Sequence, residues 1–368
     1  MDITVKKSEL FRELQYVQGV VERKTTVPIL SNLLLEASGN NLGVTATDLD
    51  VTLRCSCPAD IDQAGSLTVS ARKLFDIVRL LPEADIHFQS ASPDWMNVAC
   101  ERARFKIAGV SKENFPEVPE VEVATVELPA NAVRYMISRC IFAITQEESR
   151  YTLNGALMIV NPDSLTYVTT DGHRLVLISR NLEVEGCTEE IRVLVPKKTL
   201  VELNQLASEE IDKVEFGHTA KHLFFRAGER LLVSRILTGQ FPNYEMVIPT
   251  ENNREVTLES RDFIDALKRV AVMADEQSQS VRFRIQEGQV EISSASSDFG
   301  EAKEAIAARY EKDDIEIGFN AQYLLDFLTN VDSDEVILAL RDHENQGLLK
   351  PKGESNYEYL YVIMPLKI

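Results

Sequence analysis

The sequence predicts an α+β protein of three tandem domains with similar folds, each carrying two helices on antiparallel sheets. Three observations lead to this class. Short motifs recur at a nearly constant spacing, helical and strand-like periods alternate within each recurrence, and turn residues separate adjacent strands by only a few positions. The 368 residues are enough for two or three domains of roughly 150 residues each.

The long repeat is visible as residue pairs that return at a fixed interval. A Thr-Asp or Ser-Asp pair ends a strand-like stretch three times, with 123 positions between the first two copies. A Phe-Pro pair returns after 126 positions, and a Met-Pro pair follows another 123 positions later. In chain order the pairs are Thr47-Asp48, Phe115-Pro116, Thr170-Asp171, Phe241-Pro242, Ser297-Asp298 and Met364-Pro365. Such a period indicates a three-copy array.

The domain boundaries are expected where this periodicity is interrupted. Proline and acidic residues cluster without an apolar pattern near 119–127 and 249–255, which is typical of linkers. The expected domains are therefore 1–122, 123–250 and 251–368.

Two helix patterns occur in each repeat. Apolar residues spaced i, i+4, i+7 mark the first helix, and residues spaced i, i+3, i+4, i+7 mark the second. The first helices are expected over 10–17, 133–140 and 263–270, and the second over 74–81, 200–207 and 324–331. The two helices of a repeat lie about half a period apart, so a smaller unit of one helix and several strands is used six times.

Strand patterns fill the sequence between the helices. Residues 42–47 and 85–89 alternate with a period of two and are rich in β-branched and aromatic types. Short turn signals, such as those at 39–41 and 161–163, separate neighbouring strands. Connections this short favour antiparallel hairpins, because parallel strands need long crossovers.

The composition excludes several classes of protein. The chain has 39 Lys+Arg against 58 Asp+Glu, a net charge of −19, which argues against a protein that coats itself in nucleic acid but allows a locally basic surface. No apolar run approaches the roughly 20 residues of a membrane span, and the N-terminus lacks the apolar core of a signal peptide. The five cysteines are odd in number and scattered, so we expect buried thiols in a cytoplasmic protein without membrane contacts.

Enzyme motifs are missing from the sequence. It has no phosphate-binding loop, dinucleotide fingerprint, nucleophile elbow or His-Glu-x-x-His. His218 and His222 have the i, i+4 spacing of two metal ligands on a helix, but their neighbours alternate like strands, which favours a hairpin loop. Cys55 and Cys57 share one face of a strand without a second ligand pair nearby. We therefore expect no catalytic residue, no metal and no cofactor.

The most distinctive local motif is Asp-Gly-His-Arg-Leu at 171–175. Asp-Gly supplies the positive φ angles of a tight hairpin. An enzyme using Asp171, His173 and Arg174 is the main alternative, but no nucleophile or base partner has a recognisable spacing, whereas a surface binding role stays open. The C-terminal residues 361–368 are apolar to the end, so we expect this terminus to be docked.

Basic residues return at matching places of the repeat. The pairs at 72–73 and 197–198 begin second helices, and further basic residues are Lys24 and Arg150. Equivalent helices of a curved array present their polar faces to one surface. The repetition therefore indicates a positive surface inside an acidic protein.

Six segments in order resemble the bacterial sliding clamp family, the beta subunits of DNA polymerase III. The segments are 27–35, 71–76, 151–155, 170–175, 241–244 and 361–365. The resemblance covers the entire chain. It implies a non-catalytic processivity factor of the clamp fold, in which a head-to-tail homodimer of three-domain chains closes into a six-domain ring around duplex DNA.

The resemblance also implies partners and site residues. DNA would be held through its phosphates without base readout, and a hydrophobic groove would dock short peptides of the replicative polymerase, the clamp loader, other polymerases and repair proteins. The implied DNA contacts are Lys24, Arg72, Lys73, Arg150, Tyr151, Lys197 and Lys198. The implied groove residues are Leu153, Thr170, Gly172, His173, Arg174, Leu175, Pro242, Val247, Val362, Met364, Pro365 and Leu366.

The implied subunit interface brings Phe105 and Ile107 of one chain against Val272 and Met273 of the other. Met246 lies where relatives often carry arginine, which leaves one contact at the groove rim open. A ring or arc that binds proteins but not DNA is a third alternative to the clamp and the enzyme.

Overall fold

The computed structural model describes residues 1–22, 26–92, 94–119, 125–145, 147–296, 300–353 and 355–367. They form two compact units, residues 1–134 with 198–236 (unit 1) and residues 135–197 with 237–368 (unit 2). Lys24, the Ser297-Asp298 pair and the expected boundary at 122 lie outside the described residues. No described helix is long and apolar enough to cross a lipid bilayer.

Six α-helices occur in the described residues, two in each third of the chain. They are α1 (Lys7–Val17), α2 (Ala71–Leu80), α3 (Ala130–Cys140), α4 (Lys197–Leu206), α5 (Ser260–Ala271) and α6 (Ala321–Leu328). Each helix forms because one stripe is buried, as for Leu10, Leu14 and Val17 of α1. The six helices expected from the apolar spacing are confirmed, with ends that differ by a few residues.

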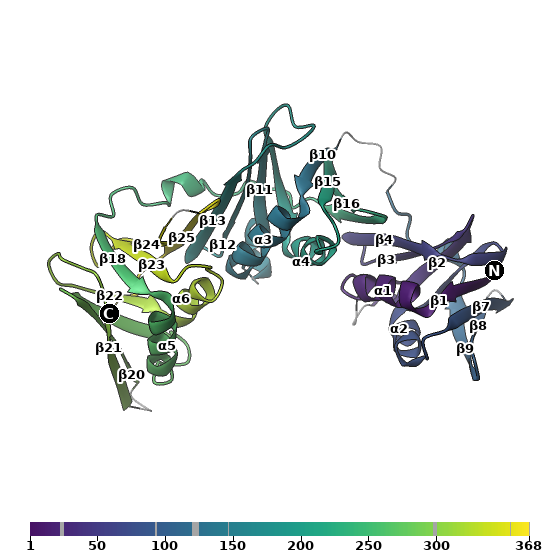
Figure 1. The fold of residues 1–368 in the computed structure, drawn as a ribbon, viewed down its shortest axis with the longest axis horizontal. Coiled ribbons are helices and arrows are strands. Elements are labelled where there is room, and N and C mark those ends of the chain that lie inside the picture. The colour runs from purple at the N-terminus through teal and green to yellow at the C-terminus, as the bar shows by residue number, and fades with distance from the viewer. Residues whose placement is uncertain are drawn as a thin grey trace. The chain divides into compact units, whose positions relative to one another are not determined.

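A single 13-stranded sheet runs through unit 1, and α1 and α2 pack against each other beside it (Figure 1). In sheet order the strands are β10 (Val126–Pro129), β15 (Lys213–His218), β16 (His222–Ala227), β17 (Arg230–Arg235), β4 (Val51–Pro58), β3 (Asn41–Thr47), β2 (Asn32–Ser38), β6 (Gly65–Ser70), β9 (Ala103–Val110), β8 (Trp95–Cys100), β7 (Asp85–Ser92), β1 (Asp2–Lys6) and β5 (Asp60–Gln63). His218 and His222 flank the turn between β15 and β16, which confirms the predicted hairpin.

Two sheets make up unit 2, with α5 and α6 packed together. The larger has the order β14 (Ile191–Pro196), β11 (Gly155–Asn161), β12 (Ser164–Thr170), β13 (Arg174–Asn181), β25 (Glu358–Ile363), β24 (Gly347–Pro351), β23 (Glu335–Leu340) and β18 (Arg254–Glu259). The smaller has the order β21 (Gly300–Ala307), β20 (Gln289–Ser296), β19 (Ser280–Gln286) and β22 (Ile315–Asn320).

Every described strand pairing is antiparallel. The predicted α+β class with helices on antiparallel sheets is therefore confirmed. All five cysteines are buried free thiols, also as expected. Burial raises the pKa of Cys57 to about 12, so this thiol stays protonated and inert near neutral pH.

Candidate functional site

A tight turn between β12 and β13 is held by its own side chains. The Asp171 carboxylate accepts the backbone N–H groups of His173 and Arg174 at 2.9 and 3.1 Å. The Thr170 hydroxyl accepts from the Gly172 N–H at 3.0 Å and donates to the Arg174 carbonyl at 2.6 Å. Gly172 has a φ of 90°, which glycine adopts without strain. The predicted hairpin is confirmed, and it leaves His173 exposed.

An apolar cluster covers the sheet face beside this turn. Leu175 of β13 lies opposite Val362 of β25, so the two side chains share one face. The cluster consists of Leu153, Leu157, Ile159, Val168, Leu175, Leu177, Leu194, Leu237, Phe241 and Val362, with Tyr244, Val247, Ile248, Leu348 and Leu360 half-buried at its edge. Of the expected groove residues, Leu153, Leu175 and Val362 thus lie in one cluster, and Val247 borders it.

The C-terminal segment runs past the same turn. The backbone N–H of Met364 donates to the His173 carbonyl at 2.9 Å, and that of Leu366 donates to the Gly318 carbonyl at 2.8 Å. Met364 is 44% exposed, while Pro365 is half-buried. The expected docking of the C-terminal segment is confirmed as far as Leu366, and it leaves the apolar Met364 side chain accessible beside His173.

Arg174 lies on the other face of β13 from Leu175, because strand side chains alternate. Its guanidinium is buried and bonded at every nitrogen. Nε donates to the Asp171 carboxylate at 3.0 Å, Nη1 to the Asp326 carboxylate at 2.5 Å, and Nη2 to the Phe142 carbonyl at 2.9 Å. The Arg174 side chain therefore links Asp171 of the turn to Asp326 of α6. It does not line the apolar face that contains Leu175.

Three residues that fix Arg174 were not anticipated from the sequence. Besides Asp326, they are Tyr323 of α6 and Phe142 of the short helix η3 (Ile141–Ala143), whose rings lie 4.2 and 5.4 Å from the guanidinium carbon. Asp326 is 152 positions from Arg174, so spacing alone does not link them. The available signal is the single carboxylate within the apolar stretch 324–328, which indicates a buried charge that needs a partner.

Arg150 and Tyr151, two expected DNA contacts, lie beside the turn in the helical segment η4 (Glu148–Leu153). Arg150 donates to the Asp171 carbonyl at 2.6 Å and pairs with Glu147 at 3.2 Å. Tyr151 is 52% exposed. Arg150 therefore contacts the turn after β12, and the Tyr151 side chain is open to solvent.

The four basic residues at helix starts differ in their freedom. The Arg72 side chain is 90% exposed, with a loose ion pair to Asp76 at 3.9 Å, and Lys73 is exposed as well. Lys197 donates to the Ile144 carbonyl at 3.3 Å, and burial together with Arg174 lowers its pKa. The structure thus brings together two open cations at α2, whereas the Lys197 ammonium is tied to the backbone.

Lys198 is held more tightly than Lys197. Its ammonium lies 2.5 Å from the Asp48 carboxylate and 2.8 Å from the Val20 carbonyl. The Lys198 side chain is 36% exposed, and its ammonium is already paired with the Asp48 carboxylate.

The expected interface residues are partly open to solvent within their own units. Phe105 and Ile107 alternate along β9, where Phe105 is 38% exposed. Val272 and Met273 follow α5, and Val272 is 75% exposed. Exposed apolar side chains of this size are candidates for a protein contact.

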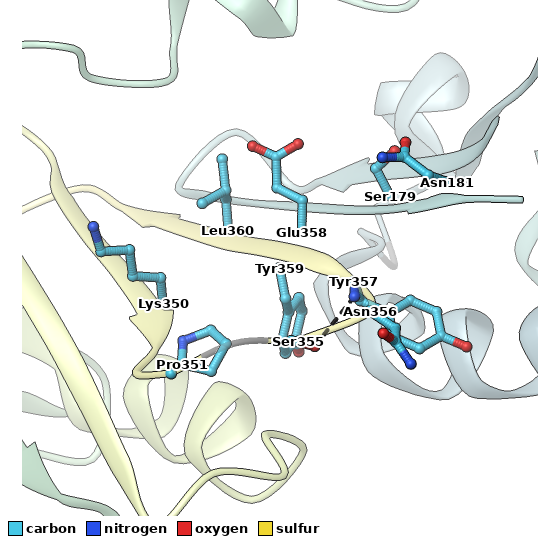
Figure 2. A pocket seen from close by; sticks show the side chains of 11 residues that line it. Ser179, Asn181, Lys350, Pro351, Ser355, Asn356, Tyr357, Glu358, Tyr359 and Leu360 are labelled. Carbon is cyan, nitrogen blue, oxygen red and sulfur yellow. Dashed lines mark hydrogen bonds between the residues drawn. The ribbon is translucent and has the colours of Figure 1, made fainter. Parts of the chain in front are cut away.

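An open polar pocket of about 960 Å³ continues the apolar face along β13 and β25 (Figure 2). Leu360 belongs to the pocket lining and also to the edge of the apolar cluster. The other lining residues are Ser179, Asn181, Lys350, Pro351, Gly353, Ser355, Asn356, Tyr357, Glu358 and Tyr359. The face is therefore apolar next to the turn and polar at its far end.

Comparison with known proteins gives three family matches in chain order. They are described as the DNA polymerase III beta subunit N-terminal domain over residues 1–119, its central domain over 127–243 and its C-terminal domain over 245–367. The three-domain organisation inferred from the repeat is thereby confirmed. The central match spans parts of both compact units.

Relatives match the full length of the chain. The beta sliding clamp of Pseudomonas putida is 35% identical over 373 residues, covering 100% of both chains. That of Chlamydia muridarum is 31% identical over 369 residues, covering 100% of this chain and 99% of the relative. Among solved structures, the Pseudomonas aeruginosa sliding clamp bound to griselimycin has a TM-score of 0.94 at 32% identity, with 100% of both chains covered.

Proposed function

Because the chain belongs to the DNA polymerase III beta subunit family, we propose that three of its surfaces perform the function of a sliding clamp. Such a clamp is a non-catalytic processivity factor that encircles duplex DNA and tethers the polymerase. The observation that carries this function is the match of three family domains in order over nearly the whole chain. The enzyme alternative based on Asp171, His173 and Arg174 is set aside, since the family acts without catalysis.

The first proposed surface is a peptide groove on the apolar face of unit 2. Leu153, Leu175 and Val362 would hold the apolar anchors of an extended peptide, with His173 and Met364 at one end. A preformed apolar surface with a few polar groups suits this mode of binding. The replicative polymerase, the clamp loader, other polymerases and repair proteins are the proposed partners, each through a short motif.

The second proposed surface is the DNA-facing side of the helices. Arg72 and Lys73 are open cations, while Lys197 and Lys198 would have to release backbone or Asp48 contacts to bind phosphate. With a net charge of −19, the chain repels DNA elsewhere. A few cations on an acidic protein support weak, sequence-independent contacts, which suit sliding.

The third proposed surface joins two chains head to tail. β21 is the outer strand of its sheet, and β9 pairs with β6 only through Gly109 and Val110 in the described residues, so both present backbone groups for a further ladder. Phe105 and Ile107 would then meet the exposed Val272 and neighbouring Met273 of a second copy. A heterologous contact of this kind closes into a ring when the rotation allows it.

Two further assignments belong to the proposal. The proposed domain boundary at 122 falls between the first two family matches, which end at 119 and begin at 127, whereas the proposed boundary at 250 falls inside the third match, which begins at 245. Cytoplasmic localisation is supported by the five buried cysteines, none of which is disulfide-bonded in the described structure.

Negative-stain electron microscopy of the purified protein tests the assembly directly. The clamp reading predicts six-lobed rings with a central hole wide enough for a DNA duplex. Solid particles or open arcs would contradict the ring and leave a scaffold that binds proteins without encircling DNA.

A further inference from the structure

The turn at 170–174 has a close counterpart in unit 1. The Thr47 hydroxyl lies 3.1 Å from the Leu49 N–H and 3.2 Å from the Val51 carbonyl. The Asp48 carboxylate accepts the N–H groups of Asp50 and Val51 at 2.9 and 2.6 Å. These bonds repeat, residue for residue, those made by the turn after β12, so Val51 occupies the position of Arg174.

The helices that follow the two turns also correspond. Leu200 and Leu203 of α4 are buried in the same spacing as Leu324 and Phe327 of α6. Glu202 therefore occupies the position of Asp326, the carboxylate that binds Arg174.

The two carboxylates differ in their partners. Asp326 has the Arg174 guanidinium at 2.5 Å, but the arginine position in unit 1 is held by Val51, which carries no charge. Lys198, the nearest cation on α4, is bound to Asp48 and to the Val20 carbonyl. None of the hydrogen bonds or ion pairs found among the described residues involves the Glu202 carboxylate.

Glu202 is nevertheless buried, with 3% of its surface exposed. It packs against the backbone just after α1, where a Cβ placed on Gly19 would lie 2.2 Å from its carboxylate oxygen. The described charged groups that act on it are Lys198 from its own helix and Asp48 from the facing turn. Burial, opposed by Lys198 and reinforced by Asp48, raises the pKa of Glu202 to about 7.

We propose that Glu202 is a proton-controlled contact between α4 and the segment after α1. With the carboxyl group neutral, α4 packs closely on Gly19, and ionisation loosens this contact because the charge has no bonded cation. In unit 2, Arg174 bonds both the Asp326 carboxylate of α6 and the Phe142 carbonyl just after α3, so the matching link stays closed at the same pH. The chain thus places its adjustable contact in unit 1 and its permanent one next to the peptide groove.

The direction of the pH effect follows from proton binding. The folded protein holds the Glu202 proton up to about pH 7, whereas an opened segment releases it near the ordinary pKa of 4.5. Opening of the segment is therefore favoured as the pH rises above about 4.5, and this effect levels off above about pH 7. Between pH 6 and 8 the opening constant should rise roughly tenfold.

Hydrogen exchange of the full-length protein between pH 6 and 8 tests this proposal, because it needs neither DNA nor a partner peptide and is therefore independent of the clamp assignment. After correction for intrinsic exchange, amides of 17–22 and 198–206 should lose about tenfold protection in the wild type. In Glu202→Gln, which keeps shape but cannot ionise, protection in these segments should be constant. Equal pH profiles for wild type and variant would overturn the proposal.

Two more variants make the test specific. Asp326→Asn, at the matched position, should reduce protection of 321–328 at every pH without a new pH dependence, since it removes the carboxylate paired with Arg174. Glu202→Met offers an uncharged apolar replacement of similar length. If amide protection still falls with rising pH in both Glu202 variants, another group causes the effect and the proposal is wrong.

Discussion

Two sheet faces with the same strand register, one in each unit, carry different side chains, and the row in unit 2 is the more apolar. In both units, three neighbouring strands place cross-strand partners in a row, on the strand face opposite to Val51 in unit 1 and to Arg174 in unit 2. The rows are Leu34-Thr45-Arg54 in unit 1 and Leu157-Val168-Leu177 in unit 2. The next strand adds Leu231 to the first row and Leu360 to the second.

The difference shows that the repeated fold does not by itself make a binding site. Thr45 and Arg54 provide hydrogen-bonding and charged groups where Val168 and Leu177 provide apolar surface. An apolar peptide anchor would desolvate those polar groups without replacing their hydrogen bonds, which is unfavourable. One groove per chain is therefore expected, although the strands that could form a second one are present.

Removing residues 364–368 should have the largest effect on peptide binding at the proposed groove of unit 2. Met364 is bonded to His173 at the end of the apolar face, so its loss removes one wall of the groove. We expect stimulation of the polymerase on primed DNA to fall to the level without clamp, while size-exclusion chromatography still detects dimers. Retained stimulation would show that the groove lies elsewhere.

Exchanging one residue between the two sheet faces should abolish most of the difference in peptide binding between them. Leu177→Arg places the unit 1 residue on the unit 2 face and is expected to weaken peptide-dependent stimulation at least tenfold, or about 1.4 kcal/mol. The matched control Arg54→Leu should change stimulation less than twofold. Thermal unfolding of both variants shows whether the fold is retained, and similar losses in the two would refute the assignment to unit 2.

Charge reversal at α2 tests which cations reach DNA. Arg72→Glu with Lys73→Glu should lower the slope of log affinity against log salt by about two, since each phosphate contact contributes about 0.9. Lys198→Ala should change the slope less, because its ammonium is held by Asp48 and Val20. A larger change for Lys198 than for the α2 pair would reverse the proposed order.

His173→Ala should have the smallest effect. The side chain is exposed at the tip of the turn and makes no contact on which the described fold depends, whereas its backbone bonds remain in the variant. We expect polymerase stimulation to need a few-fold more clamp, with rings unchanged in the electron microscope. Loss of the ring would assign His173 a structural role.

Much of the fold follows from patterns that are local in the chain. The spacing of Leu10, Leu14 and Val17 predicts α1 because one helical stripe must be buried, and the Asp-Gly pair at 171–172 predicts its turn through φ alone. The groove itself stays a prediction. The resemblance implies both Leu175 and Arg174 as groove residues, and alternation along β13 puts their side chains on opposite faces.

The sequence by itself determined the α+β class, the threefold repeat, the hairpin turns and the family, because periodicity and turn chemistry depend on residues close together in the chain. The tertiary structure decided which charges are neutralised. Arg174 bonds Asp326 across 152 positions, whereas Val51 takes the matching turn position in unit 1 and Glu202 has no bonded cation among the described residues. The free energy of a buried charge depends on such distant partners, and only the folded chain brings them into contact.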